Sequence, residues 1–235
     1  MLFRSNATNG ALDSADVSKG VTNAFTAPAG GDTFVHGFNS LTATTGFSGR
    51  YYNSSNFNPI SPNKGGSIRG AMRRYSAGAN YAPMFGFIAG TNVGSNKAYV
   101  VGLSNSDPYQ IVLAKIIPNT GLPTTGASVL RVSDESFSST SKWHHLRLDV
   151  IVNPHGDVRL VALSNDLDAV GADVAVPDWQ PISGMDDYTD DALSVLTGTA
   201  PLVSGFRGFF GHYNGGEAGK VSLFDHLEIH RQIAP

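Results

Sequence analysis

Four aspartates near residue 190 are the residues of this 235-residue chain whose type and spacing come closest to a metal site. Closely spaced carboxylates supply the hard oxygen ligands that Ca²⁺ prefers. The segment lacks the glycine-punctuated ladder of a dedicated calcium loop. The favoured interpretation is therefore a short helix over residues 186–196 whose first turn carries acids, because the helix dipole stabilises negative charge there. The weak calcium candidates are Asp186, Asp187, Asp190 and Asp191.

The residue patterns of common hydrolases are missing. Glutamate occurs only at Glu135, Glu217 and Glu228, so no strand carries the paired carboxylates at period two that retaining glycoside hydrolysis requires. The chain has no Gly-x-Ser-x-Gly elbow for a nucleophilic serine and no cysteine. Neighbouring His144 and His145 would point to opposite faces of a strand and would not bind one metal together. The sequence therefore predicts that the chain is not an enzyme, with no catalytic or cofactor-binding residues.

A cluster of aromatic and amide residues near position 50 suits contact with a sugar or a partner. Tyr51 and Tyr52 offer rings that stack on a sugar, and Asn53 and Asn56 offer hydrogen bonds. The same residue types suit a wet protein interface, where tyrosine is enriched. The sequence leaves both interpretations open.

Composition argues against two classes of partner. The formal net charge is −3 and charged residues make up only 15% of the chain, whereas nucleic-acid binding normally leaves a basic footprint. Arg69, Arg73 and Arg74 form no single stripe, because Arg74 falls on the opposite face of an extended strand. No segment approaches the roughly 20 apolar residues of a membrane helix, and the first residues lack the pattern of a signal peptide. We expect neither a nucleic-acid nor a membrane partner.

The elements that must position these residues are strands. Residues 141–165 predict a β-hairpin, because apolar and polar residues alternate on both sides of the turn Asn153-Pro154-His155-Gly156. Other β-branched or aromatic runs, separated by turn residues, lie at 67–75, 84–89, 98–103, 109–117, 128–132, 206–212 and 220–230. With hardly any helical periodicity, this pattern predicts an all-β, two-sheet antiparallel jelly-roll sandwich with at most one or two short helices.

The chain is expected to divide into two parts. Residues 1–30 are polar with scattered apolar positions, which predicts an extended N-terminal arm or, alternatively, an edge strand. Residues 31–235 are predicted to form a single β-sandwich domain, a length that such folds reach without dividing. The residues expected to make assembly contacts from the arm are Leu2, Phe3, Arg4, Val21 and Phe25.

Two segments carry a resemblance to a known fold family. Residues 143–150 and 157–160 resemble the tryptophan-led central hairpin of concanavalin A-like lectin/glucanase domains, a group that includes laminin-G-like modules. Residues 205–211 and 221–229 are similar to the last two strands of that group. The resemblance implies a jelly-roll fold and says little about function, because this fold hosts lectins, hydrolases, adhesion modules and virion proteins.

In style, the cysteine-free, weakly charged jelly roll is similar to structural proteins of tailed bacteriophages. This resemblance implies a non-enzymatic virion structural protein, either a capsid decoration protein or a component of the tail or fibre, assembled in the host cytoplasm. Its expected partners are other virion proteins and further copies of itself in a homo-oligomer. The alternative is a carbohydrate-binding, lectin-like module for host adhesion. Neither function requires a cofactor, although calcium at the aspartates is compatible with the second.

Overall fold

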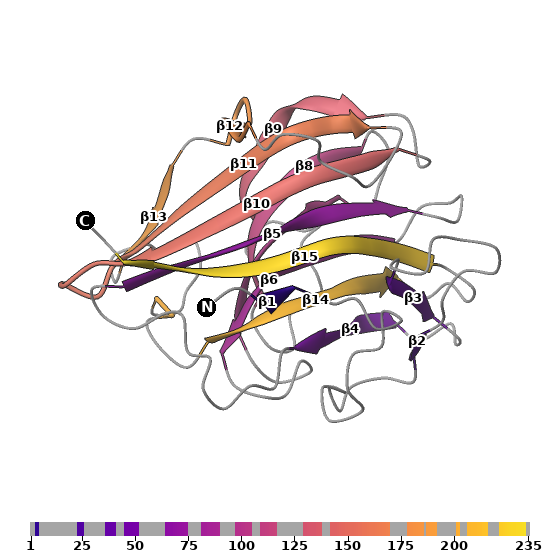
Figure 1. The fold of residues 1–235 in the computed structure, drawn as a ribbon, viewed down its shortest axis with the longest axis horizontal. Coiled ribbons are helices and arrows are strands. Elements are labelled where there is room, and N and C mark those ends of the chain that lie inside the picture. The colour runs from indigo at the N-terminus through magenta and orange to yellow at the C-terminus, as the bar shows by residue number, and fades with distance from the viewer. Residues whose placement is uncertain are drawn as a thin grey trace.

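The computed structural model folds the chain into two antiparallel β-sheets that lie one behind the other (Figure 1). We refer to them as sheet A and sheet B. The structure describes residues 3–4, 23–25, 36–40, 45–51, 64–74, 81–89, 97–104, 109–116, 129–137, 142–169, 178–185, 187–191, 201–202, 206–215 and 221–233.

Sheet A contains nine strands and is built around the central trio β10, β5 and β15. The order across the sheet is β12 (Gln180–Pro181), β11 (Val158–Ala169), β10 (Trp143–Val152), β5 (Lys64–Arg74), β15 (Val221–Ile233), β3 (His36–Ser40) and β2 (Asn23–Phe25). Two short strands pair outside this path, β13 (Tyr188–Asp190) with β11 and β1 (Phe3–Arg4) with β15.

Sheet B contains six strands, and four consecutive ones form an up-and-down meander. The order is β4 (Thr45–Tyr51), β14 (Phe206–Gly215), β6 (Tyr81–Ala89), β7 (Ala98–Leu103), β8 (Tyr109–Ile116) and β9 (Val129–Phe137). The runs at 98–103 and 109–117, which the sequence predicts to be strands, form β7 and β8 and pair with each other.

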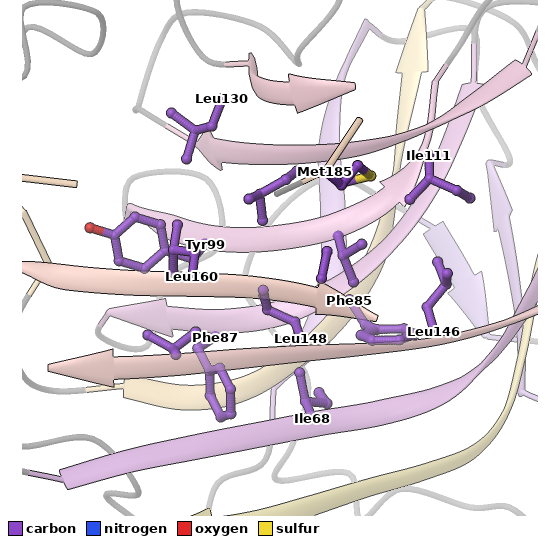
Figure 2. Packing of buried hydrophobic residues seen from close by; sticks show 14 of the residues in the cluster. Ile68, Phe85, Phe87, Tyr99, Ile111, Leu130, Leu146, Leu148, Leu160 and Met185 are labelled. Carbon is purple, nitrogen blue, oxygen red and sulfur yellow. The ribbon is translucent and has the colours of Figure 1, made fainter. Parts of the chain in front are cut away.

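The main core lies between the sheets and follows from period-two alternation. On β10, Leu146, Leu148, Val150 and Val152 are all fully buried and face sheet B. Phe85 of β6 is one of the large side chains that meet them from the other sheet (Figure 2). Burying each such side chain stabilises the fold by about 1.5–3 kcal/mol.

Sheet B is also buried on its second face. A separate apolar cluster on that face consists of Ala82, Met84, Ile88, Ala98, Val100, Val112, Ala114 and Ile116, each at most 7% exposed. Strands covered on both faces read as continuous apolar runs, which explains why residues 98–103 and 111–114 show little alternation. The outer face of sheet A, rather than that of sheet B, is therefore the one that can carry a polar binding surface.

The predicted central hairpin is confirmed. Asn153 N donates to Asp157 O at 2.9 Å, and Gly156 N donates to Asn153 O at 3.1 Å. Gly156 has φ +91°, a conformation that glycine adopts without steric cost. The Asn153 side chain closes the turn by accepting from the His155 and Asp157 amides, each at 3.0 Å. This turn fixes the register between β10 and β11.

The expected helix over 186–196 is wrong where the structure describes it, because residues 188–190 form β13 and pair with β11. Over this stretch alternate residues are buried and exposed, with Tyr188 and Asp190 inside and Thr189 outside. Tertiary pairing has overridden a weak local preference for helix. Residues 192–196 lie outside the described residues.

The N-terminal region contributes two strands to sheet A. Phe3 and Arg4 pair with Ile229 and Glu228, and β2 pairs with β3. The division into an arm at 1–30 and a single domain at 31–235 stays a prediction. Within the described part of the chain, no helix has the length and apolar character needed to cross a membrane.

Candidate functional site

Three neighbouring strands of sheet A bring charged residues together on its outer face. Glu228 of β15 lies opposite Arg69 of β5, and Arg69 lies opposite Arg147 of β10. Their chain neighbours Ile229, Ile68 and Leu148 are fully buried in the core. Because successive side chains of a strand point to opposite faces, the charged row faces away from the core.

Two residues further along these strands, the next row adds His230 of β15 and Asp149 of β10. They lie on either side of Ser67 of β5. We call Arg69, Arg147, Asp149, Glu228 and His230 together the polar face. Its members come from positions 69, 147–149 and 228–230, and only the sheet brings them together.

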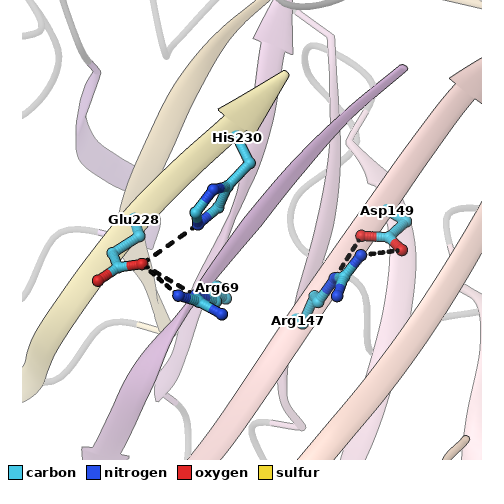
Figure 3. A network of polar contacts seen from close by, with 5 residues as sticks. All are labelled: Arg69, Arg147, Asp149, Glu228 and His230. Atoms are coloured by element: carbon cyan, nitrogen blue, oxygen red, sulfur yellow. Dashed lines mark hydrogen bonds and ion pairs between the residues drawn. The ribbon is translucent and has the colours of Figure 1, made fainter. Parts of the chain in front are cut away.

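Hydrogen bonds hold the polar face in a fixed arrangement (Figure 3). Arg69 donates to Glu228 Oε2 from Nε at 3.0 Å and from Nη2 at 2.6 Å. His230 Nε2 lies 3.2 Å from the same oxygen. Arg147 makes a bidentate contact with Asp149, in which Nε donates to Oδ1 at 2.7 Å and Nη2 donates to Oδ2 at 2.8 Å. Charge-assisted contacts of this kind are about twice as strong as neutral ones and orient both partners.

The polar face is balanced in charge and partly open. Two guanidinium groups sit on adjacent strands, an arrangement that would be unfavourable without the two carboxylates beside them. The side chains of the two ion pairs keep between 11% and 27% of their surface exposed, and His230 keeps 31%. Nη1 of Arg69 and of Arg147 makes no hydrogen bond with any residue that the structure describes. These two donors point to a hydroxyl-rich ligand as the kind of molecule that the polar face suits.

The environment shifts two pKa values in the polar face. Burial alone would raise the pKa of Glu228, but the hydrogen bond and charge of Arg69, with a smaller contribution from His230, lower it below the usual 4.5. Burial and the charge of Arg69 lower the pKa of His230 below the usual 6.5, against the opposing effect of Glu228. At neutral pH, Glu228 is therefore an anion and His230 is uncharged, so the imidazole both donates and accepts hydrogen bonds.

An apolar patch borders the polar face along the same strands. Ala71, Trp143, Ala169 and Leu223 form a small buried cluster on the outer side of sheet A. The Arg73 guanidinium lies 4.9 Å from the centre of the Trp143 ring, within the range of a cation–π contact. On the outer side of sheet A, the polar face is thus partly exposed to solvent, whereas the neighbouring apolar patch is buried.

Sequence reasoning missed the polar face, although part of its signal was visible. Arg147-x-Asp149 and Glu228-x-His230 place charged or titratable residues two positions apart, which puts each pair on one side of a strand. The link to Arg69 was not visible, because it depends on which strands are neighbours. Asp149 and Glu228 are separated by strand β5, so they are not the adjacent carboxylate pair sought for glycoside hydrolysis.

The predicted calcium ligands are used in other ways. Arg159 donates to Asp187 on the surface, with Nε–Oδ2 at 2.7 Å. Asp190 is fully buried against Lys115. Asp191 is half-buried, and the side chain of Asp186 lies outside the described residues. Among the residues described, no group of three or more carboxylates and imidazoles could hold a metal ion.

The neighbouring histidines do lie on opposite faces of β10. His144 is opposite core-facing Met72, and its ring lies 5.1 Å from that of Phe137 in an edge-on arrangement. His145 is opposite Ala71 on the outer side and is 2% exposed.

The remaining predicted contact residues stay predictions. Tyr51 ends β4 of sheet B, whereas the polar face belongs to sheet A. Phe3 and Arg4 lie in β1, and Phe25 lies in β2. The other predicted residues fall outside the described ones; they are Leu2, Val21, Tyr52, Asn53 and Asn56.

Comparisons with known proteins reveal similarity in fold only. No family model matches the chain, and no curated protein matches it. Among solved structures, the alginate lyase Aly36B is 10% identical with a TM-score of 0.49, covering 83% of this chain and 80% of its own. The Emp47p carbohydrate recognition domain is 8% identical with a TM-score of 0.48, covering 94% and 92%. A conserved carbohydrate esterase from the Shiga toxin-encoding bacteriophage phi24B is 14% identical with a TM-score of 0.49, covering 100% and 98%.

These structures correct one expectation. The prediction that the chain is not an enzyme is contradicted, because the structures that share its fold include a lyase and an esterase. That prediction tested mainly for paired glycosidase carboxylates and a serine elbow, and the absence of these two patterns does not exclude other enzyme chemistry. The fold class is as predicted: the chain is an all-β, two-sheet antiparallel jelly-roll sandwich, and its structural neighbours include lectin-like domains.

Proposed function

We propose that this chain binds carbohydrate on the outer face of sheet A, with the polar face as the contact surface. The observation that carries the proposal is the pair of partly exposed arginine–carboxylate groups on adjacent strands, held by hydrogen bonds of 2.6–3.0 Å. A sheet surface whose only role was to keep the protein soluble would not need charged side chains that are held in fixed positions and partly removed from water.

The chemistry of the polar face matches that of a sugar. Each sugar hydroxyl both donates and accepts hydrogen bonds, so it needs donors and acceptors at neighbouring points. Arg69 and Arg147 supply the donors, and Asp149 and Glu228 supply the acceptors. Uncharged His230 donates from Nε2 to Glu228 Oε2, so its Nδ1 is a further acceptor. Because the ion pairs already orient these groups, binding loses little side-chain entropy.

Charge balance favours a neutral sugar. The polar face contains two guanidinium groups and two carboxylates, so its net charge at neutral pH is zero. An acidic polysaccharide would have to compete with Asp149 and Glu228 for the arginine donors. We therefore expect neutral glycans to bind more tightly than uronate-rich ones.

Calorimetry with glycans found on a broad array would test the proposal. We expect Arg147→Met to weaken binding about tenfold or more, which corresponds to the loss of one charge-assisted hydrogen bond. The matched control is Arg159→Met, which removes an exposed arginine on the neighbouring strand β11 and should leave affinity unchanged. Equal affinities for Arg147→Met and the unaltered protein, with both folded, would refute the role of the polar face.

A virion structural role is a second proposal, and one feature of sheet A supports it. Strand β1 is held to β15 through only two residues, Phe3 and Arg4. So short a pairing is easily exchanged for the same strand of another copy, a common route to symmetric assembly. Deleting residues 1–29 should then leave a folded domain that no longer enters particles. Undiminished incorporation of the deletion variant would refute this second proposal.

A further inference from the structure

A second cluster of reactive groups lies inside the sandwich, away from the polar face. Lys115 Nζ of β8 lies 2.6 Å from Asp190 Oδ2 of β13, and both side chains are fully buried. The Tyr99 hydroxyl, from β7, donates a hydrogen bond to the same carboxylate oxygen. Strand β8 belongs to sheet B and β13 pairs with β11 of sheet A, so this contact joins the two sheets.

The cluster is unusual as a plain ion pair. Two charges removed from water lose several kcal/mol of hydration each, and a buried pair regains this only when all polar atoms are satisfied. Here Asp190 Oδ1 is buried and has no hydrogen-bond partner among the described residues. The buried environment of Lys115 and Asp190 therefore favours a neutral product over two separate charges.

We propose that Lys115 and Asp190 condense to an intramolecular amide, an isopeptide bond that covalently ties sheet B to sheet A. The Lys115 ammonium first gives a proton to Asp190 Oδ2, which leaves a neutral amine and a neutral acid. The Nζ lone pair attacks Cγ, the Cγ–Oδ2 bond breaks, and Oδ2 departs as water. An ammonium and a carboxylate thus become one amide and one water, so no oxidant, metal or activating co-reactant is needed.

Tyr99 is placed to move the proton in this step. Its hydroxyl protonates the departing Oδ2 and recovers a proton from Nζ. The Leu202 amide donates to the Tyr99 oxygen at 2.9 Å, which fixes the direction of the hydroxyl. Fixing the reacting groups in contact gives effective concentrations far above those reached in solution.

Protonation in the cluster is consistent with this chemistry. Burial lowers the pKa of Lys115, against the opposing effect of Asp190. The neutral, nucleophilic form of the amine therefore forms more readily than it does in water. Burial and the hydrogen bond to Asp190 raise the pKa of Tyr99, so the phenol keeps its proton except during transfer.

Intact mass of the purified full chain is the direct test. We expect a mass lower by one water molecule than the sequence requires. Trypsin should not cleave at Lys115, and it should release one cross-linked species that joins peptides 98–131 and 160–207. A full sequence mass, with free cleavage at Lys115 after denaturation, would overturn the proposal.

Variants separate the amide from other losses of water. Lys115→Arg keeps a positive charge but cannot form the amide, so it should have the full sequence mass. Tyr99→Phe should slow the mass change about a hundredfold, as expected for loss of a positioned proton donor. Asp187→Ala is the matched control, because it alters an exposed carboxylate three residues from Asp190 and should keep the lower mass. A lower mass in Lys115→Arg, or its loss in Asp187→Ala, would contradict the assignment to Lys115 and Asp190.

Discussion

The two arginine–carboxylate pairs Arg69–Glu228 and Arg159–Asp187 provide an internal test of what fixes the polar face. Both involve an arginine Nε and Nη2 on one carboxylate oxygen. They differ in exposure, with side-chain exposed fractions of 27% and 14% for the first pair and 53% and 46% for the second. The perturbation is a double-mutant cycle on each pair, with arginine changed to methionine and the acid changed to alanine.

The expected coupling energies follow from this difference in exposure. Hydrogen bonds to charged groups that are partly shielded from water are worth about 1.5–3 kcal/mol, and residual exposure reduces this for Arg69–Glu228 to about 1–2 kcal/mol. A solvent-exposed pair such as Arg159–Asp187 should couple by less than about 0.5 kcal/mol. In a chain of this length, 1 kcal/mol corresponds to about 2–4 °C in Tm.

Urea unfolding followed by tryptophan fluorescence would measure the four free energies of unfolding in each cycle. The reasoning requires the coupling of Arg69–Glu228 to exceed that of Arg159–Asp187 by a margin larger than the error. Equal coupling energies, or a larger one for the surface pair, would refute the claim that the polar face is held rigid by partly buried ion pairs.

Two further predictions concern the stability of the fold. Gly184→Ala should cost more stability than Gly156→Ala, although both glycines have positive φ, because an added Cβ would lie 2.6 Å from Asp134 Oδ1 at 184 and near nothing at 156. We expect about 1–2 kcal/mol for Gly156→Ala from backbone strain alone. Equal losses in chemical denaturation would contradict the crowding at 184. Stability should also fall as the pH drops below 6.5, because unfolded His230 binds a proton that the folded state resists, and fall further below 4.5 as Glu228 is protonated. Thermal unfolding between pH 7.5 and 4 checks this, and a His230→Gln variant with the same dependence between pH 6.5 and 5 would exclude His230 as its source.

The hairpin of β10 and β11 was predictable because its information is local. Alternating residues set the strands, and Asn153 and Gly156 set the turn, all within about 25 residues. The acidic run was misread because its partners are distant in sequence. Asp187 is paired with a residue 28 positions away, and Asp190 with one 75 positions away. Local helix preference was therefore the only signal available, and tertiary pairing reversed it.

The polar face could not be predicted, because its formation depends on strand order. Arg69, Arg147 and Glu228 meet only because β5 lies between β10 and β15 in sheet A. A period-two pattern predicts which side of a strand a residue occupies, but not which strand lies beside it. The buried contact of Lys115 with Asp190 was hidden for the same reason, since β8 and β13 belong to different layers of the fold.

Binding of neutral glycans to the unaltered chain and to Arg147→Met is the measurement that tests carbohydrate recognition by the polar face most directly. Titration calorimetry with the glycans that score highest on an array should show saturable binding by the unaltered chain. Arg147→Met should weaken this binding about tenfold, whereas Arg159→Met should not. No binding to any glycan, or binding that Arg147→Met leaves unchanged, would contradict the proposal.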